Sequence, residues 1–495
     1  MRIRLIALAV TLAFLMTLFL PLAHGALPSP SSNSTRTPIK HVVEIMMENH
    51  SFDNLFGVYP ANSLSTSKAV AANITRPINL ITTNNSQGLQ KVPSGTFTTP
   101  DPIEGYSAYH LDWNNGKMNG FKANSGPQSM TYYTAAQVAP EWVIAQQYAL
   151  DQCDFAMLTE TCPNRLYNLA GYSPVINDYG PPPYIPYTQS IMSELDSGSI
   201  SWGYYVHDRS SGYYPLTYFN GIQQHMGNIH SWTDFFSSLN NNSLPSVSWV
   251  MPIGSGGSGY YSQGPNANVL TGEMWFLYII NAIMKSPTWN TTAIFLTYDE
   301  GGGYYDQVAP PYFHGVQLGQ RVPFMVISPY AKEDYISSTI LDQGSIPAFI
   351  DYNWNLPALN EFVWHSGIPL DMFDFSKPYP SGAIIRSPLN LSGMGLPIPG
   401  EIAFNTNSSL DRNYSSLFPS KFQVPYSQLP YGTSGSDTFS LSDLNSTLYV
   451  TSNFPLVPFY FSGTMLYFLL LLSVTLIIFF PGYMQGRHGR KRGAK

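Results

Sequence analysis

The chain has 495 residues, of which only 11% are charged and 14% aromatic, and its formal net charge is −7. This length suits one large α/β domain with appendages, or two to three smaller domains. Because no basic stripe runs along the body of the chain, the composition argues against nucleic acid as a partner.

The first 25 residues predict a secretory signal peptide. Arg2 and Arg4 precede an apolar run over residues 5–22, and small residues follow it around Gly25. Cleavage just after Gly25 fits this pattern, and an uncleaved anchor is the alternative. We therefore expect the rest of the chain to be exported.

Residues 38–378 predict an α/β catalytic domain. Mostly apolar runs at residues 42–47, 246–251, 292–298 and 322–328 are typical of buried strands. Residues 139–153 and 270–286 have the apolar spacing of helices. Alternating strands and helices favour an α/β sheet.

Polar side chains follow two of the apolar runs at the point where each predicted strand ends. Glu48 and Asn49 come directly after the first run, and Asp299 and Glu300, followed by three glycines, come after the third. Ligands gather at the carboxyl ends of strands in open α/β sheets, so we expect one shared site. Three carboxylates and an amide are costly to bury without a cation, and they suit a hard divalent ion better than Zn²⁺. The alternative is that each pair merely caps a following turn or helix.

A third polar segment, TETCPNRLYNLAGY, begins at Thr159. Pro163 suits the first position of a helix, which places Thr161 or Cys162 at its N-cap, where free backbone N–H groups bind anions. If Thr161 also touches the metal, its alkoxide can attack phosphorus; otherwise Thr161 is a plain helix cap. Arg165 either clamps phosphate or pairs with a carboxylate.

The chain has only two cysteines, Cys153 and Cys162. They form one disulfide in an oxidising exterior, or they are two buried thiols. Two cysteines are too few for a Cys-based zinc cage.

Beyond the predicted catalytic domain, residues 379–456 are rich in Ser, Asn and Pro and predict a spacer or a small accessory module. Residues 457–481 contain 18 consecutive uncharged residues and predict a transmembrane helix. Residues 482–495 form a basic tail, which the positive-inside rule places in the cytoplasm. We therefore expect a single-pass protein of the cell membrane with its catalytic domain outside the cell.

Five sequence blocks occur in an order that resembles a known family. They are ENHSFDNLFG, DWNNGKMNGF, TCPNRLY, YDEGGGYYDQVAPP and RVPFMVISPYAKEDYIS. Together they resemble the bacterial and archaeal phosphoesterase family of non-haemolytic-type phospholipases C and related acid phosphatases. The resemblance covers residues 40–378. It implies an alkaline-phosphatase-like α/β fold with a central, mostly parallel sheet flanked by helices.

The resemblance also implies roles for individual residues. The family's nucleophile corresponds to Thr161, and a histidine that contacts phosphate or donates a proton corresponds to His110. The family's metal ligands correspond to the two strand-end pairs, Glu48, Asn49, Asp299 and Glu300.

The chain departs from the family pattern at its histidines. Residues 263–265 read Gln-Gly-Pro where the family usually has Glu-His-Pro, and residues 306–307 read Asp-Gln where it usually has Asp-His. His225 lies roughly where relatives carry another histidine, with His207 and His230 as alternatives. The general acid is therefore open.

We predict an extracellular, membrane-anchored, metal-dependent phosphoesterase, either phospholipase C-like or an acid phosphatase. Its substrate would be a phosphoester or a phospholipid, and its cofactor a divalent metal ion of open identity. The alternative is a catalytically impaired cell-surface protein that keeps the phosphoesterase fold, which the missing histidines allow.

Overall fold

The computed structural model describes residues 34–59, 88–94, 96–134, 137–178, 184–207, 214–252 and 261–376. All of them belong to one compact unit, Met1–Leu441. The predicted signal peptide, spacer, transmembrane helix and basic tail lie outside these ranges and stay predictions. Within the ranges, no helix is long and apolar enough to cross a membrane.

The described residues build a mixed central sheet of nine strands, in the order β14–β4–β13–β10–β1–β9–β6–β8, with β15 pairing beside β4. Strand β13 runs antiparallel to both of its neighbours, and all other pairings in this sheet are parallel. The strands are β1 (His41–Met47), β4 (Ala149–Phe155), β6 (Trp202–Val206), β8 (Ile229–Ser231), β9 (Val247–Val250), β10 (Thr292–Tyr298), β13 (Arg321–Ile327), β14 (Tyr335–Ser337) and β15 (Leu341–Asp342).

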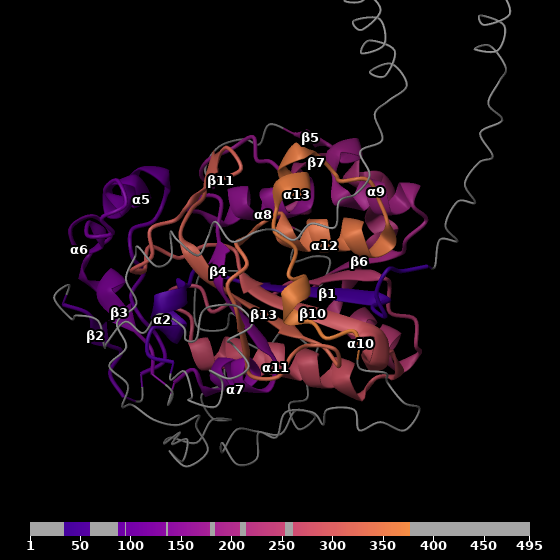
Figure 1. Ribbon diagram of the computed structural model, residues 1–495, viewed down its shortest axis with the longest axis horizontal. Coiled ribbons are helices and arrows are strands. Elements are labelled where there is room, and N and C mark those ends of the chain that lie inside the picture. Colours follow the sequence, from indigo (N-terminus) through magenta and orange to yellow (C-terminus); the bar gives the residue numbers. More distant parts are fainter. Residues whose placement is uncertain are drawn as a thin grey trace, which may run out of the picture. The chain divides into compact units, whose positions relative to one another are not determined.

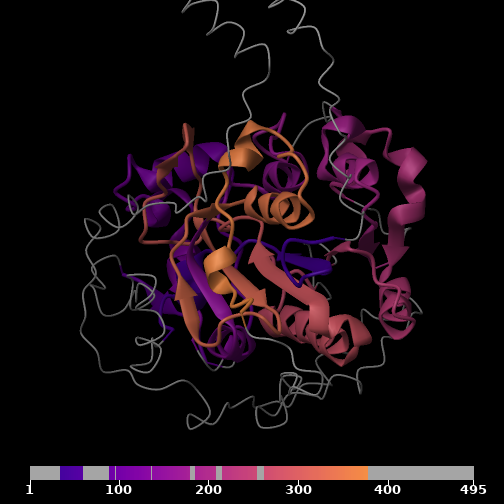
Figure 2. The ribbon, with the colours of Figure 1, turned by 45° about the vertical axis from the view of Figure 1, so that its right-hand side comes forward.

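Helices cover both faces of the sheet, as the two ribbon views agree (Figures 1 and 2). One face carries α8 (Thr161–Ala170), α9 (Ile191–Ser197), α12 (Ser345–Trp354) and α13 (Glu361–His365). The other carries α7 (Ala139–Gln147), α10 (Trp232–Asn240) and α11 (Val269–Lys285). Short helices α2 (Phe52–Phe56), α5 (Tyr106–Trp113) and α6 (Phe121–Asn124) lie to one side. This layering is the α/β architecture that the alternating pattern predicted.

Short elements complete the described part. Three two-stranded pairs are β2 (Gln90–Lys91) with β3 (Thr131–Tyr132), β5 (Ile185–Pro186) with β7 (Phe219–Asn220), and β11 (Tyr312–Phe313) with β12 (Val316–Gln317). The 3₁₀ turns are η3 (Pro127–Met130), η4 (Tyr187–Gln189), η6 (Leu216–Tyr218), η7 (Ile222–Asn228), η8 (Pro287–Thr291) and η9 (Leu370–Met372).

The central strands β1 and β10 are buried on both faces, as their apolar runs predicted. The predicted strands at 246–251 and 322–328 and the predicted helix at 270–286 are also present, within one or two residues of their expected bounds.

The predicted helix over residues 139–153 was wrong in its second half. Helix α7 ends at Gln147, and the next residues form β4 between β13 and β14. The polar residues of β4 are buried but bonded: Asp154 accepts from Thr297 at 3.1 Å, and Gln152 donates to Ser338 at 3.0 Å. Pairing with two neighbouring strands therefore outweighs the helical spacing of the apolar residues.

Candidate active site

The ends of β1 and β10 meet at one edge of the sheet. The two strands are parallel neighbours in register, with Met47 opposite Tyr298. Asp299 donates its backbone N–H to the carbonyl of Met47 at 3.1 Å, and the Asn49 N–H donates to Asp299 Oδ1 at 3.2 Å. The structure thus brings together the two strand-end pairs that the sequence singled out 250 residues apart.

The backbone at this edge is tight. Asn49 has a left-handed backbone with φ of 63°, a conformation that Asn tolerates better than most residues. Gly302 also has positive φ, and a Cβ atom there would lie 2.2 Å from the carbonyl oxygen of Asn49. The glycines after Glu300 therefore let the loop that follows β10 pass directly against the loop that follows β1.

Helix α8 carries the third polar segment to the same edge. The helix begins at Thr161 with Glu160 as N-cap, so the expected N-cap at Thr161 or Cys162 was wrong by one to two residues. Pro163 sits at the third helical position, which it tolerates because the first four N–H groups of a helix have no intrahelical acceptor. Asn164 holds the preceding loop by accepting from the N–H groups of residues 157 and 158 and donating to the carbonyl of Glu160.

Arg165 joins the two strand-end pairs. Its Nε and Nη2 lie 3.1 and 3.0 Å from Asp299 Oδ2, and Nη2 lies 3.4 Å from Glu48 Oε1. The remaining nitrogen, Nη1, contacts the sulfur of Met251 at 3.2 Å. All three charged side chains are nearly buried, so Arg165 is the counter-charge of two strand-end carboxylates, one of the two roles left open by the sequence.

Thr161 lies beside this ion pair. Its side chain is half-buried and lies near the Asp299 carboxyl, whose pKa it helps to lower. The next backbone N–H, that of Cys162, donates to Asp178 Oδ1 at 2.6 Å. A carboxylate therefore already occupies part of the anion site at the start of α8, as the free N–H groups and the helix dipole favour. The sequence analysis missed Asp178, because an isolated Asp in a loop carries no recognisable signal.

Burial shifts the ionisation of the cluster. It raises the pKa of Glu48 to about 7 against the opposing effect of Arg165, and it raises the pKa of Asp299 in the same way. The pKa of Glu300 lies well above its usual range because of burial and the nearby carboxyl of Glu104. One Arg is therefore not enough to keep all of these carboxyls in their charged form.

The donor atoms of the cluster fit a cation. Glu48 Oε2, Asn49 Oδ1 and Glu300 Oε1 are buried and have no hydrogen-bond partner in the part of the chain that the structure describes. Such orphaned oxygens are costly unless a cation or a proton satisfies them. In the described ranges, no three His, Cys, Asp or Glu side chains already stand close enough to hold a metal ion together.

Glu104 is a further carboxyl at this site that the sequence analysis missed. Its Oε2 accepts a hydrogen bond from Asn49 Nδ2 at 2.9 Å, which fixes the amide and leaves Asn49 Oδ1 as an unused acceptor. Burial, and then the neighbouring Asp101, raise the pKa of Glu104 to about 8. Its only sequence signal is its position just before the block that begins at Asp112.

The structure does not bring the two predicted catalytic histidines to this cluster. His110 is exposed on α5, where its Nδ1 contacts the carbonyl of Tyr106 at 2.7 Å. His225 stacks on Tyr187 and lies 3.2 Å from Asp196 Oδ2. Among the described residues, no hydrogen bond or ion pair links either histidine to the cluster.

His50, Gln263 and Gln307 are parts of the framework. His50 is buried between the Asn54 side chain and the carbonyl of Gln263, and burial lowers its pKa to about 4. Gln263 donates to Glu141 at 2.9 Å, and Gln307 donates its N–H to Asp53 at 2.7 Å. Gln307, which stands at a family histidine position, and Gln263, which stands at a family glutamate position, are thus hydrogen-bonded to buried carboxyls.

A buried ion network stabilises the start of α2 and the loop that follows β10. Arg321 is fully buried, with Nε 3.1 Å from both carboxylate oxygens of Asp306 and Nη2 3.0 Å from Asp53 Oδ1. Asp306 Oδ2 in turn accepts the N–H of Asp53 at 3.1 Å. The network links the start of α2 to the loop after β10, so Asp53 and Asp306 serve the structure of the site.

Cys153 and Cys162 are both buried free thiols. Of the two alternatives left open by the sequence, the structure therefore has the pair of thiols.

Comparisons with known proteins cover the same part of the chain. Residues 39–357 match the model of a family described as the Phosphoesterase family. The chain is 28% identical over 449 residues to "Phospholipase C A" of Mycobacterium tuberculosis, across 74% of this chain and 83% of that protein. It is 26% identical over 457 residues to the "Non-hemolytic phospholipase C" of Burkholderia pseudomallei, across 73% of this chain and 63% of that protein. Among solved structures, a protein in the alkaline phosphatase superfamily from Vibrio parahaemolyticus is similar to this chain with a TM-score of 0.31 and 10% identity. The match covers 71% of this chain and 72% of the Vibrio chain. The family match spans every residue of the cluster, from Glu48 to Glu300.

Proposed function

Because the chain belongs to the Phosphoesterase family and is a phosphoric ester hydrolase, we propose that it is a phospholipase C-like enzyme with Thr161 as its nucleophile. One observation carries the proposal: the half-buried Thr161 hydroxyl at the start of α8 lies near the Asp299 carboxyl and helps to lower its pKa, and Arg165, which pairs with Asp299, follows one helical turn later. This arrangement places a nucleophile, an anion site and a cationic side chain within one turn of a helix.

In this proposal, different residues of the chain bind the phosphate, orient the nucleophile and attack phosphorus. The N–H groups at the start of α8 that Asp178 does not occupy and the guanidinium of Arg165 bind the phosphate oxygens, which neutralises charge in the transition state. The Asp299 carboxylate, which lies near Thr161, orients the Thr161 hydroxyl. The oxygen of Thr161 attacks phosphorus, the bond to the substrate alcohol breaks, and water then hydrolyses the phosphothreonine.

The cofactor in this proposal is a divalent cation held by the four strand-end residues, Glu48, Asn49, Asp299 and Glu300. The three orphaned oxygens among them support this assignment. A bound cation would supply positive charge that lowers the pKa of the Thr161 hydroxyl and offsets the charge of the phosphate. An all-oxygen donor set favours a hard ion such as Mg²⁺, Mn²⁺ or Ca²⁺.

Replacement of Thr161 tests the nucleophile, and Thr159 supplies a matched control. Thr161→Ala should lower turnover of a chromogenic phosphodiester by at least ~10³-fold, and Thr161→Ser should retain substantial activity. Thr159 is buried and its hydroxyl has no hydrogen-bond partner, so Thr159→Ala should change turnover little. Acid quenching with a labelled substrate should place phosphate on the peptide that contains Thr161.

Two results would decide against the proposal. An active Thr161→Ala enzyme, or label on another residue, would mean that Thr161 is not the nucleophile. Failure of the wild-type chain to hydrolyse either phosphatidylcholine or p-nitrophenyl phosphate at any pH would favour the catalytically impaired surface protein. The extracellular location and the membrane anchor stay predictions from the sequence.

A further inference from the structure

Asp178 holds a carboxyl group at the start of α8, beside the proposed nucleophile. Its Oδ1 accepts the backbone N–H of Cys162 at 2.6 Å, and Cys162 follows Thr161 directly. The backbone N–H of Asp178 donates in turn to the side chain of Glu160, the N-cap residue of the same helix. These two contacts fix an acidic side chain at the place where the proposed mechanism binds a phosphate.

Asp178 carries a negative charge at mildly alkaline pH. Partial desolvation of its carboxyl raises the pKa of Asp178 to about 6, and the N–H of Cys162 opposes the shift. The carboxyls of Glu160 and Asp299 add to the rise in pKa by repulsion, whereas Arg165 lowers it. Asp178 is therefore mostly ionised at pH 8, and it interacts with the same charges that a bound phosphate would meet.

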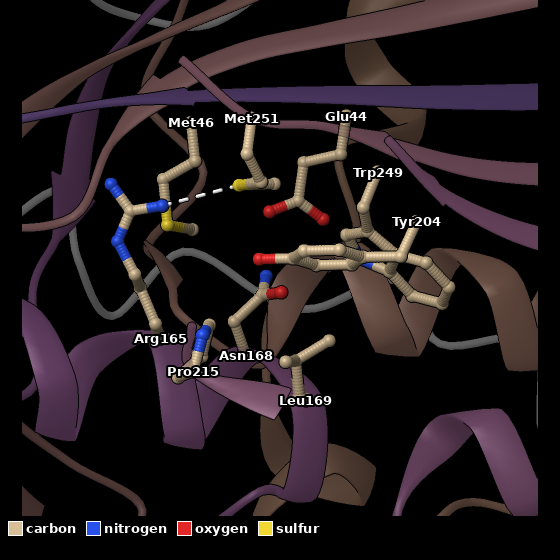
Figure 3. Close-up of a pocket in the computed structure, with 9 residues that line it drawn as sticks. All are labelled: Glu44, Met46, Arg165, Asn168, Leu169, Tyr204, Pro215, Trp249 and Met251. Atoms are coloured by element: carbon tan, nitrogen blue, oxygen red, sulfur yellow. Dashed lines mark hydrogen bonds between the residues drawn. The ribbon is translucent and has the colours of Figure 1, made fainter. Parts of the chain in front are cut away.

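The cluster offers little positive charge to balance a further negative one. In the described part of the chain, Arg165 is the cationic side chain that ion pairs join to the cluster, and it pairs with both Glu48 and Asp299. Its Nη1 contacts the sulfur of Met251, as the dashed line in Figure 3 marks. The charge of Arg165 is thus already shared between two carboxyls, so each negative charge on a substrate adds to the repulsion from Asp178.

Phosphodiesters and phosphomonoesters differ by one charge. A diester carries one negative charge, whereas a monoester has a second pKa of about 6 and carries two negative charges at pH 8. When the Thr161 hydroxyl loses its proton and its oxygen bonds to the phosphorus of a diester, one ester bond breaks and that alcohol leaves with a proton. The remaining ester bond keeps the intermediate singly charged. A monoester would instead leave a doubly charged phosphothreonine beside Asp178.

We propose that Asp178 is a specificity-determining residue, whose carboxylate at the start of α8 disfavours doubly charged phosphomonoesters and thereby selects phosphodiesters. The inference rests on the proposed function, because it assumes that phosphate binds at the start of α8 with Thr161 as the nucleophile. Repulsion between like charges is a general means of rejecting a wrong ligand. The same repulsion favours release of the phosphomonoester that hydrolysis of a diester leaves in the site.

Asp178→Asn tests the charge alone, because the Asn side-chain oxygen can still accept the N–H of Cys162. The kcat/KM of the full chain is measured at pH 8 for bis(p-nitrophenyl) phosphate and for p-nitrophenyl phosphate, which share one leaving group. The substitution should raise kcat/KM for the monoester about tenfold and change kcat/KM for the diester about threefold or less. An unchanged ratio of the two values, or an equal loss with both substrates, would overturn the inference.

Calorimetry with inorganic phosphate tests the same charge without any turnover. This ligand is mostly a dianion at pH 8, so Asp178→Asn should bind it about tenfold more tightly than wild type does, whereas the affinity for dimethyl phosphate, a monoanion, should change about threefold or less. Asp234→Asn is the matched control, because Asp234 is exposed and accepts the backbone N–H of Ser231 at the start of α10 at 2.9 Å. It should change neither the phosphate affinity nor the ratio of kcat/KM values.

The two measurements separate this inference from the proposed function. Equal affinity of wild type and Asp178→Asn for inorganic phosphate would overturn the role of Asp178. Tighter phosphate binding by Asp178→Asn, in a chain that hydrolyses neither ester, would instead overturn the proposed function alone.

Discussion

The buried network around Arg321 allows a quantitative prediction of stability. Arg321→Met keeps the start of the aliphatic stem but removes the guanidinium, together with its charge and its packing on Phe52, whose ring centre lies 4.2 Å from Cζ. The substitution removes contacts of 3.0–3.2 Å to Asp53, Asp306 and the carbonyl of Gln152. It leaves two fully buried carboxyls without a counter-charge.

Removal of one partner of a buried ion pair typically costs about 3–5 kcal/mol, and we expect Arg321→Met to lose that much free energy of unfolding. For a domain of this size, such a loss corresponds to a fall in Tm on the order of 10 °C. Urea unfolding followed by tryptophan fluorescence measures the first quantity, and calorimetry measures the second. The exposed Arg36 is the control, because Arg36→Met should cost less than about 1 kcal/mol.

The pH dependence of the stability lost in Arg321→Met identifies the cause of that loss. Burial, and then the neighbouring Asp306, raise the pKa of Asp53 to about 8 even in the presence of Arg321. A carboxyl whose pKa is higher in the folded state stabilises the fold below its unfolded pKa and loses that contribution as pH rises. The loss of stability in Arg321→Met should therefore be smallest at low pH and grow as the pH rises through about 8, where Asp53 becomes charged in wild type but stays protonated in the variant, and Asp53→Asn in that background should recover part of the loss. A loss below 1 kcal/mol, or no recovery, would refute the reasoning.

Two further predictions concern Glu104 and a distant carboxyl pair. Mn²⁺ should raise the Tm of Glu104→Leu less than that of the wild type, because the Asn49 amide is then free to rotate. Glu104→Gln keeps an acceptor for this amide and should retain most of the rise in Tm. Equal rises in Tm in both variants would contradict a positioning role for Glu104. Glu194 and Asp351 pack against each other, and burial together with mutual repulsion raises the pKa of Asp351 to about 8, while burial raises that of Glu194 to about 7. The stability that this pair contributes should be present below about pH 4.5 and lost as the pH rises toward 8. Glu194→Gln should therefore reduce the difference between the Tm at pH 5 and the Tm at pH 8. An unchanged Tm difference would contradict the raised pKa values of the pair.

The sequence predicted the parts of the site that lie at the ends of regular elements. Glu48 and Asp299 follow strands with clear apolar patterns, and Arg165 lies in a block that resembles the phosphoesterase family, a resemblance that the family match confirms. Glu104 and Asp178 come from irregular segments, where no periodicity indicates which side chains face the site.

The helix expected over residues 139–153 was wrong in its second half because spacing of apolar residues does not reveal which neighbours a segment will pair with, and here β4 joins the sheet. The role expected for His225 rests on its approximate position along the chain and stays a prediction, and the structure places this residue on η7 in contact with Asp196. Position along a chain predicts position in space only where a regular element connects the two.

The pairing of β1 with β10 also bears on how the chain folds. Glu48 and Asp299 are neighbours only after a loop of about 250 residues has closed, and the entropy lost in closing a loop rises with its length. Contacts between residues so distant along the chain form slowly and late. A nascent chain that ends before β10 already contains Glu48, Thr161 and Arg165, but it lacks the partner that joins them. Catalytic competence would therefore appear only when most of the domain has been synthesised, and an unfinished chain would carry the candidate nucleophile without the strand that completes its site.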